Sequence, residues 1–249
     1  MKQTDSLNKL CQIKDKNERA CEIVKFFVSE YESHRGVFKN RINAEDHILE
    51  NTTDKEKSLF LFYIIQLDYA TKSQRLYKEA KKLWASGKKY YIPQIILKMS
   101  DIDLKSLLKS YLSPRYINEA VKRWNLNSKK LINEYNSNPI NIFKLSNDAK
   151  KIENAIREFR GFGPKIGNFF FRAMVNTFDF KLKNINKVTQ PVDRHDIRLS
   201  FEWGLIDSKD INKKNITKVK EIWQEACDNA DKSWLIFDRA MWVWGSLLN

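Results

Sequence analysis

Residues 158–168 have the sequence Glu158-Phe159-Arg160-Gly161-Phe162-Gly163-Pro164-Lys165-Ile166-Gly167-Asn168. Apolar residues at helical spacing precede and follow this stretch, so it predicts two helices joined by a tight turn. Gly161 and Gly163 allow backbone conformations that a side chain would block, and Phe162 between them can anchor the turn in the core. Amide N–H groups at the start of the second helix would then face outward, where a phosphate can accept their hydrogen bonds.

A second informative stretch is Pro191-Val192-Asp193-Arg194-His195. Asp193 precedes a predicted helix, where aspartate is a common N-cap. A carboxylate can also stabilise positive charge or take part in proton transfer. Lys165 lies just past the turn. It could be a solvated or phosphate-contacting lysine, or it could be a nucleophile. For each residue, sequence position alone leaves both interpretations open.

The composition indicates a folded, mainly helical chain with a polyanionic partner. Of its 249 residues, 42% are hydrophobic, and only 7 are glycine and 5 proline, which favours long helices and short loops. Lysine and arginine number 45 against 31 acidic residues, a formal charge of +14. Such a surface gains counterion-release free energy on nucleic acid, although a lysine-rich protein without such a partner would have the same charge.

Several classes of protein are disfavoured by what the sequence contains. Cys11, Cys21 and Cys227 are too few and too scattered for a disulfide framework or a four-cysteine metal site. No apolar leader follows Met1, and no run approaches the roughly 20 apolar residues of a membrane span. We therefore expect an intracellular protein of the cytoplasm or nucleoid, with no membrane partner and no protein-bound metal.

Apolar residues recur at helical spacing along most of the chain, without alternation strong enough to predict a sheet. The expected class is therefore all-α. The predicted helical segments are 17–33, 54–65, 72–84, 90–99, 101–112, 114–124, 125–135, 140–145, 149–159, 164–174, 193–203, 216–226 and 233–248. Residues 178–190 are predicted to form a basic, asparagine-rich connection.

Taken together, the two stretches resemble the helix-hairpin-helix DNA glycosylase superfamily. Residues 159–167 are similar to its hairpin, and Pro191-Val192-Asp193 followed by His195 is similar to its catalytic-aspartate segment, particularly in 8-oxoguanine DNA glycosylases. The length of the connection from 165 to 193 is most similar to that of the archaeal branch. The likeness covers most of residues 56–249.

This chain also departs from the family pattern. The family usually has Leu-Pro before the turn and Thr-Ala after the lysine, whereas this chain has Phe159-Arg160 and Ile166-Gly167. The iron–sulfur cluster of the endonuclease III branch needs four cysteine ligands, and the chain has 3 cysteines. No cofactor is therefore expected, apart from a monovalent cation that the hairpin carbonyls of the family can hold.

The resemblance implies a two-lobed fold with an active-site cleft between the lobes. A central helical-barrel domain, residues 56–185, would end in the hairpin, and residues 1–55 with 186–249 would form the second domain. Lysine-bearing members are bifunctional glycosylase/AP lyases, so Lys165 falls on the nucleophile position and Asp193 on the carboxylate position. Contacts with DNA are expected from Gly161, Gly163, Lys165, Gly167, Arg194 and His195.

A flipped-out base needs a pocket that offers stacking and hydrogen bonds. Asp238 and Trp242 lie four residues apart and share a helix face, giving one acceptor and one stacking platform. An acceptor would suit the N7–H donor that distinguishes 8-oxoguanine from guanine. Gln66 and Tyr69 are further candidates for the pocket or for strand wedging. Each of these side chains could instead be a packing residue, and His195 could make only a local hydrogen bond.

The predicted function is excision of 8-oxoguanine from double-stranded DNA by a monomeric enzyme. A neutral amine of Lys165 would displace the base, form a Schiff base with the opened sugar and permit β-elimination. Partial burial of that lysine is expected, because burial disfavours the ammonium form. Two alternatives remain: a glycosylase for another damaged or deaminated base, and a non-catalytic helix-hairpin-helix DNA-binding protein.

Overall fold

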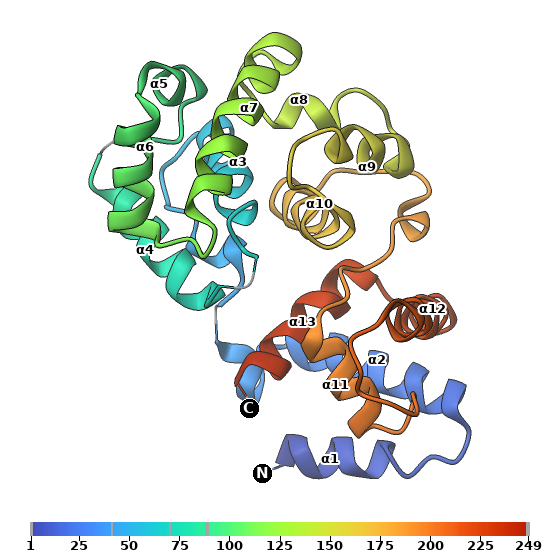
Figure 1. Ribbon diagram of the computed structural model, residues 1–249. Coiled ribbons are helices and arrows are strands. Elements are labelled where there is room, and N and C mark those ends of the chain that lie inside the picture. Colours follow the sequence, from blue (N-terminus) through green and yellow to red (C-terminus); the bar gives the residue numbers. More distant parts are fainter. Residues whose placement is uncertain (1, 41, 70, 88–89, 248–249) are drawn as a thin grey trace. The chain divides into compact units, whose positions relative to one another are not determined.

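The computed structural model describes residues 2–40, 42–69, 71–87 and 90–247 (Figure 1). Within these ranges every regular element is helical, and the extended pairing is limited to one isolated bridge between Asp148 and Lys183. The predicted all-α class is therefore confirmed. Of the helices in the same ranges, none combines the length and apolar character that crossing a bilayer requires.

The chain forms two compact units, one of Met1–Arg41 with Thr189–Asn249 and one of Ile42–Val188. Here they are called the terminal unit and the central unit. The terminal unit contains α1 (Lys2–Leu10), α2 (Lys16–Glu32), η1 (Gly36–Lys39), α11 (Arg194–Glu202), α12 (Lys213–Asn229) and α13 (Trp234–Leu247).

Aromatic rings fill the core of the terminal unit. Helix α2 packs against α12 and α13, and α11 packs against the same two helices. The ring of Phe27 lies 5.3 Å from Trp203, 5.3 Å from Trp244 and 6.1 Å from Phe237. Buried aromatic side chains contribute large hydrophobic areas, so this cluster fixes α11 and α13 relative to each other.

The central unit is built around a helix that is buried on nearly all sides. Its elements are η2 (Ala44–His47), α3 (Asp54–Ile65), α4 (Ser73–Ala85), α5 (Pro93–Lys98), α6 (Asp101–Leu107), the π-helical segment η3 (Leu108–Leu112), α7 (Ile117–Tyr135), α8 (Ile140–Phe143), α9 (Ala149–Arg157), α10 (Pro164–Phe178) and η4 (Ile185–Lys187). Every residue of α3 from 58 to 65 is buried, and α10, α4, α8 and η2 pack on that helix. The all-apolar pattern of residues 59–65 thus becomes the core that supports the hairpin.

The domain boundaries predicted from the sequence differ from these units by residues 42–55 and 186–188. Residues 42–55 group with the central unit because η2 packs on α3, α4 and α10. The connection after α10 also belongs to the central unit. Lys183 donates to Asn147 at 2.7 Å and accepts from Ala149 at 3.0 Å, which fastens the connection to the start of α9.

Two of the predicted helical segments form one helix. Segments 114–124 and 125–135 were predicted separately, whereas α7 runs without a break from Ile117 to Tyr135. The prediction of two elements is wrong because no glycine or proline interrupts residues 117–135 and because Trp124, Ser128 and Leu131 continue one buried face. The last residue of the predicted segment 233–248 lies outside the described residues.

Candidate functional site

Gly161 forms the turn between α9 and α10. Its φ of +86° lies in the left-handed region, which glycine enters without steric cost. A Cβ at this position would also lie 2.7 Å from Nε of Arg123. The left-handed backbone conformation of the turn therefore favours glycine at this position, and a larger residue would also displace the Arg123 side chain.

Packing does not explain why residue 163 is a glycine. It is the N-cap of α10, with φ −71° and no side-chain cap, and Pro164 is the first helical residue. A Cβ on Gly163 would meet no atom within 4 Å among the described residues. Since the first turn of a helix carries amide donors without intrahelical acceptors, the open, uncapped start of α10 is suited to an anion.

One face of α7 holds the turn in place. Glu119, Arg123 and Asn127 recur every four residues on this helix, so they lie in one row. The Asn127 amide donates to the Arg160 carbonyl at 3.0 Å and accepts from the Arg160 N–H at 2.9 Å. The Arg160 guanidinium donates to both carboxylate oxygens of Glu119, at 2.8 Å and 3.1 Å. These bonds from Arg160 lower the pKa of Glu119 and set the turn against α7.

Gln66, a candidate for the base pocket, is used by the same network. It is fully buried, and its amide donates to the Phe62 carbonyl at 3.1 Å. Its side-chain oxygen accepts from Asn127 at 2.9 Å, and its backbone carbonyl accepts from Arg123 at 3.1 Å. The structure thus places Gln66 beneath the hairpin, where it supports the α7 row.

Phe162 anchors the turn from inside, as predicted. Its ring is 1% exposed and stacks on Phe62 of α3, with centroids 5.1 Å apart at an interplanar angle of 21°. Phe170 of α10 meets the same ring edge-on at 5.3 Å. Gly167 permits this packing, because a Cβ there would lie 3.0 Å from the Phe162 carbonyl oxygen.

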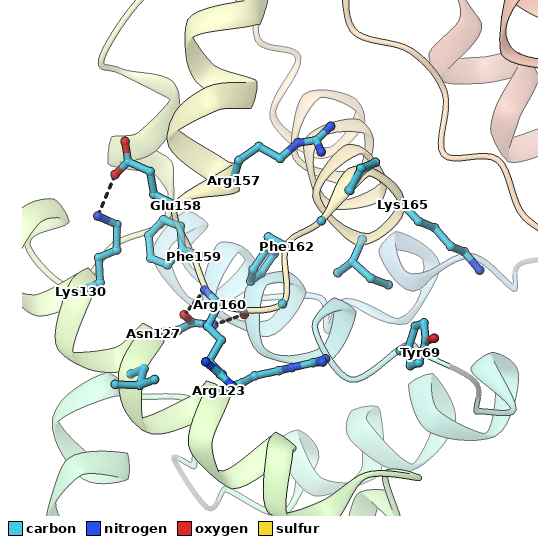
Figure 2. Close-up of a pocket in the computed structure, with 15 residues that line it drawn as sticks. Tyr69, Arg123, Asn127, Lys130, Arg157, Glu158, Phe159, Arg160, Phe162 and Lys165 are labelled. Carbon is cyan, nitrogen blue, oxygen red and sulfur yellow. Dashed lines mark hydrogen bonds and ion pairs between the residues drawn. The ribbon is translucent and has the colours of Figure 1, made fainter. Parts of the chain in front are cut away.

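A groove of about 900 Å³ runs along the hairpin, and its lining is rich in cations. The cationic side chains that line it are Arg123, Lys130, Arg157, Arg160 and Lys165. Figure 2 shows Asn127 reaching the turn at Arg160 and Lys130 reaching Glu158. Lys130 bonds Glu158 at 2.8 Å and Glu134 at 2.6 Å, so part of the positive charge of the groove is balanced within the unit.

Lys165 is the second residue of α10, directly after the uncapped start of the helix. Its side chain is exposed and extends away from the Phe162 ring (Figure 2). The partial burial expected for this lysine is therefore not what the structure shows. The exposure follows from the packing of α10, which buries Ile166, Gly167 and Asn168 on its inner face.

Tyr69 lines the same groove and is 51% exposed. Its ring lies 6.0 Å from that of Tyr116, and the Arg115 guanidinium lies 5.6 Å from the Tyr116 ring centroid. Exposed aromatic and guanidinium groups in contact form a surface on which a base can stack. The structure brings Tyr69 to the hairpin, which is compatible with the predicted wedging role.

The terminal unit holds the other half of the predicted site. Asp193 is the N-cap of α11, and its Oδ1 accepts from the N–H of His195 at 2.6 Å and from that of Asp196 at 3.4 Å. Asp196 in return accepts from the Asp193 N–H at 2.6 Å. Asp193 therefore caps α11, which is one of the two roles that its position in the sequence allowed. The residue is half-buried.

Helix α13 brings the remaining candidates of this unit beside α11. His195 is half-buried, and Gly245 allows it to lie on the backbone of α13, since a Cβ on Gly245 would be 2.8 Å from the His195 Cβ. Asp238 is 4% exposed and Trp242, one turn later, is half-buried. Arg194 is exposed. The structure therefore groups Asp193 and His195 with α13, while Lys165, Tyr69 and Gln66 are grouped in the central unit.

Two sets of side chains around these candidates were not predicted. The row of Glu119, Arg123 and Asn127 could have been found from polar residues four apart on an otherwise apolar helix face. Asp196 could have been found as the partner of Asp193, because an acidic residue three positions after an N-cap is typical of a capping box. In the described ranges, no three His, Cys, Asp or Glu side chains are grouped as a metal site would require.

Comparison with known protein families finds no model that matches this chain, and comparison with curated proteins finds no match either.

The two glycines at the start of α10 give a matched pair of predictions. Gly167→Ala is expected to destabilise the central unit by about 1–3 kcal/mol, because the methyl group meets a backbone oxygen. Gly163→Ala, in open space, is expected to leave the free energy of unfolding within about 1 kcal/mol of the wild type. On the sequence-based expectation that this turn contacts a phosphate, the same variant should weaken binding to a DNA duplex. Urea unfolding and fluorescence anisotropy with a duplex measure the two effects. Unchanged affinity in Gly163→Ala would show that no phosphate approaches this residue.

Proposed function

We propose that this chain is a bifunctional DNA glycosylase/AP lyase of the helix-hairpin-helix superfamily that excises 8-oxoguanine from double-stranded DNA. The observation that carries the proposal is the uncapped, unobstructed start of α10 at Gly163, with Lys165 two residues further on. A hairpin of this form can grip a phosphate by its backbone while a lysine stands beside it. The proposal includes the two-lobed arrangement of the family, with Lys165 and Asp193 serving one nucleotide.

The chemistry follows from the two side chains. The neutral amine of Lys165 attacks C1′ of the damaged nucleotide, the bond to the base breaks, and the base leaves with the bonding electrons. Loss of the amine proton and opening of the sugar give a Schiff base, from which β-elimination breaks the strand on the 3′ side. Asp193 stabilises the positive charge that develops on the sugar and assists proton transfer. The Lys165 side chain is exposed in the free protein, so its amine is accessible to a bound nucleotide.

The base specificity rests on α13 in this proposal. Asp238 offers an acceptor for the N7–H of an 8-oxopurine, and Trp242 offers a face for stacking. Excision rates on duplexes that contain 8-oxoguanine, uracil, an oxidised pyrimidine or an abasic site test the assignment. The proposal predicts base release and strand cleavage with 8-oxoguanine. Faster release of uracil or of an oxidised pyrimidine would assign another lesion to the same chemistry.

A second outcome of that experiment separates an enzyme from a DNA-binding protein. The cationic groove and the hairpin alone predict binding that weakens steeply with salt. Salt-sensitive binding without release of any base from the panel would favour the non-catalytic alternative.

Asp193→Asn is expected to separate the capping role of Asp193 from its charge. Asparagine caps a helix about as well as aspartate, so the free energy of unfolding is expected to stay within about 1 kcal/mol of that of the wild type. Loss of the negative charge is expected to slow base excision by roughly a hundredfold or more. Single-turnover excision and urea unfolding measure the two effects.

Asp193→Ala serves as the comparison, because it removes both the charge and the cap. It is expected to slow excision as much as Asp193→Asn does and to cost about 1 kcal/mol of stability as well. Full excision activity in Asp193→Asn would show that Asp193 only caps α11.

A further inference from the structure

Arg157 is a cationic side chain of the hairpin groove to which the proposed chemistry gives no role. It is the last residue of α9 and lines the same groove as Gly163 and Lys165. Its side chain is 29% exposed. Part of this side chain is therefore open to a ligand in the groove.

Two buried residues fix the orientation of the Arg157 guanidinium. Its Nη2 donates to the carboxylate of Glu153 at 2.5 Å and to the side-chain oxygen of Asn168 at 2.9 Å. Glu153 is 3% exposed and Asn168 is fully buried, so both acceptors are held by the packing of their helices. Figure 2 shows the Arg157 side chain leaving α9 and extending toward α10. A guanidinium held in this way loses little conformational entropy when it binds an anion.

The charges around Glu153 leave a surplus of positive charge. Its carboxylate accepts from Arg157 and also lies 2.5 Å from Nζ of Lys150, so two cations share one carboxylate. Lys150 is exposed, and the described residues that line the groove do not include it. Of these two cations, Arg157 is therefore the one that a ligand in the groove can reach.

The charges around Lys130 have the opposite balance. Lys130 also lines the groove, but its Nζ lies 2.6 Å from the Glu134 carboxylate and 2.8 Å from that of Glu158. Two carboxylates share one cation there, so this group has a net negative charge that repels phosphate. A DNA backbone in the groove is therefore expected to favour Arg157 over Lys130.

Arg160 differs from Arg157 in how its guanidinium is used. Its Nε and Nη2 bind the two carboxylate oxygens of Glu119, which is the bidentate geometry that a phosphate would otherwise take. Arg157 makes both of its bonds through Nη2. Its other terminal nitrogen, Nη1, is not used by these bonds.

We propose that Arg157 binds a backbone phosphate of DNA in the hairpin groove, and that Glu153 and Asn168 orient its guanidinium for this contact. The proposal deepens the proposed function and rests on it for the DNA partner, but it does not depend on the excision of a base. It adds a side-chain contact to the backbone contacts expected at the start of α10. A contact of this kind sets the register of the duplex without reading its sequence.

Arg157→Gln tests the phosphate contact through the salt dependence of binding. Each phosphate contact on a duplex contributes about 0.9 to the slope of log K against log salt concentration. The slope of Arg157→Gln is therefore expected to be smaller than that of the wild type by about 0.9, with binding roughly fivefold to tenfold weaker at about 0.1 M salt. Fluorescence anisotropy with an undamaged duplex at several salt concentrations measures both quantities. A slope equal to that of the wild type would contradict the proposal.

Lys150→Gln is the matched control for this substitution. It removes the same charge from the same helix and also leaves Glu153 with one cation, but it lies outside the groove lining. Its salt slope is expected to equal that of the wild type. If Lys150→Gln lowers the slope as much as Arg157→Gln does, the effect belongs to the overall charge of α9 and the proposal is wrong.

A measurement on the wild-type protein does not depend on the folding of a variant. In protein labelled with nitrogen-15 at arginine, the Nε–H resonance of Arg157 can be assigned through bonds from its backbone. Titration with the undamaged duplex is expected to shift this resonance, and added salt is expected to reverse the shift. A resonance that does not move when the protein is saturated with duplex would overturn the phosphate contact.

The outcomes separate this proposal from the proposed function. An unchanged slope in Arg157→Gln, together with excision of 8-oxoguanine by the wild type, would remove the phosphate contact and leave the glycosylase assignment in place. A lowered slope in Arg157→Gln, with no base excised by the wild type, would support the contact and remove the assignment. Absence of any binding of duplex by the wild type would contradict both.

Discussion

Lys165→Gln is expected to abolish strand cleavage and covalent trapping while leaving DNA binding largely intact. Glutamine keeps the length and polarity of the side chain but has no nucleophilic amine, so the Schiff base cannot form. Loss of a catalytic nucleophile typically costs roughly a thousandfold or more in rate. The variant should bind a duplex about as tightly as the wild type, because the hairpin backbone and the other groove cations remain. Single-turnover cleavage assays and fluorescence anisotropy measure the two properties.

Lys55→Gln is the matched control for this substitution. Lys55 is also an exposed lysine at the second position of a helix in the central unit, at the start of α3. It is expected to retain the full cleavage rate. Cleavage by Lys165→Gln at the wild-type rate would remove Lys165 from the chemistry, whatever its effect on binding.

Phe162→Ala is expected to have the largest effect on stability. The ring is buried between Phe62 of α3 and Phe170 of α10, so truncation leaves a cavity under the turn. Replacing a buried phenylalanine by alanine usually costs about 3–5 kcal/mol. Since the same ring fixes the turn that presents Gly163 and Lys165, DNA affinity should fall as well. Urea unfolding and anisotropy titrations measure these two losses.

Phe162→Leu and Phe169→Ala are informative comparisons. Phe162→Leu keeps much of the buried volume, so it is expected to cost less than Phe162→Ala. Phe169, next to Phe170 on α10, is only half-buried, with the Arg172 guanidinium 4.7 Å from its ring centroid. Phe169→Ala should therefore destabilise the unit less than Phe162→Ala does. Equal losses for Phe162→Ala and Phe169→Ala would show that the turn is not anchored by its central ring.

Hydrophobic periodicity was sufficient to predict most of the helices. The predicted segment 17–33 corresponds to α2, whose apolar residues at helical spacing are buried: Ala20, Ile23, Val24, Phe27 and Val28. The predicted segment 149–159 begins at the same residue as α9, where the N-cap Asp148 accepts from the N–H groups of Lys150 and Lys151. Such features are local, because a helix face and a cap depend on residues only a few positions apart.

Features that join distant segments were harder to predict. The contact of Asn127 with Arg160 links positions 33 apart in sequence, and no local pattern specifies it. Gln66 was a candidate for the base pocket or for strand wedging, and its hydrogen bonds to Phe62 and Asn127 beneath the turn are contacts that no local pattern indicated. The burial of Lys165 was expected from the needs of its chemistry, but exposure is decided by which face α10 turns inward. Side-chain roles of this kind follow from packing in three dimensions.

The proposed mechanism requires Lys165 to form a Schiff base with damaged DNA. The most direct measurement is borohydride treatment of the wild-type protein with a duplex that contains one 8-oxoguanine, followed by mass spectrometry of the digested adduct. The predicted result is a covalent protein–DNA adduct in which the peptide that carries Lys165 is modified at that lysine. Excision of the base without any trapped adduct, or an adduct at another residue, would contradict the assignment.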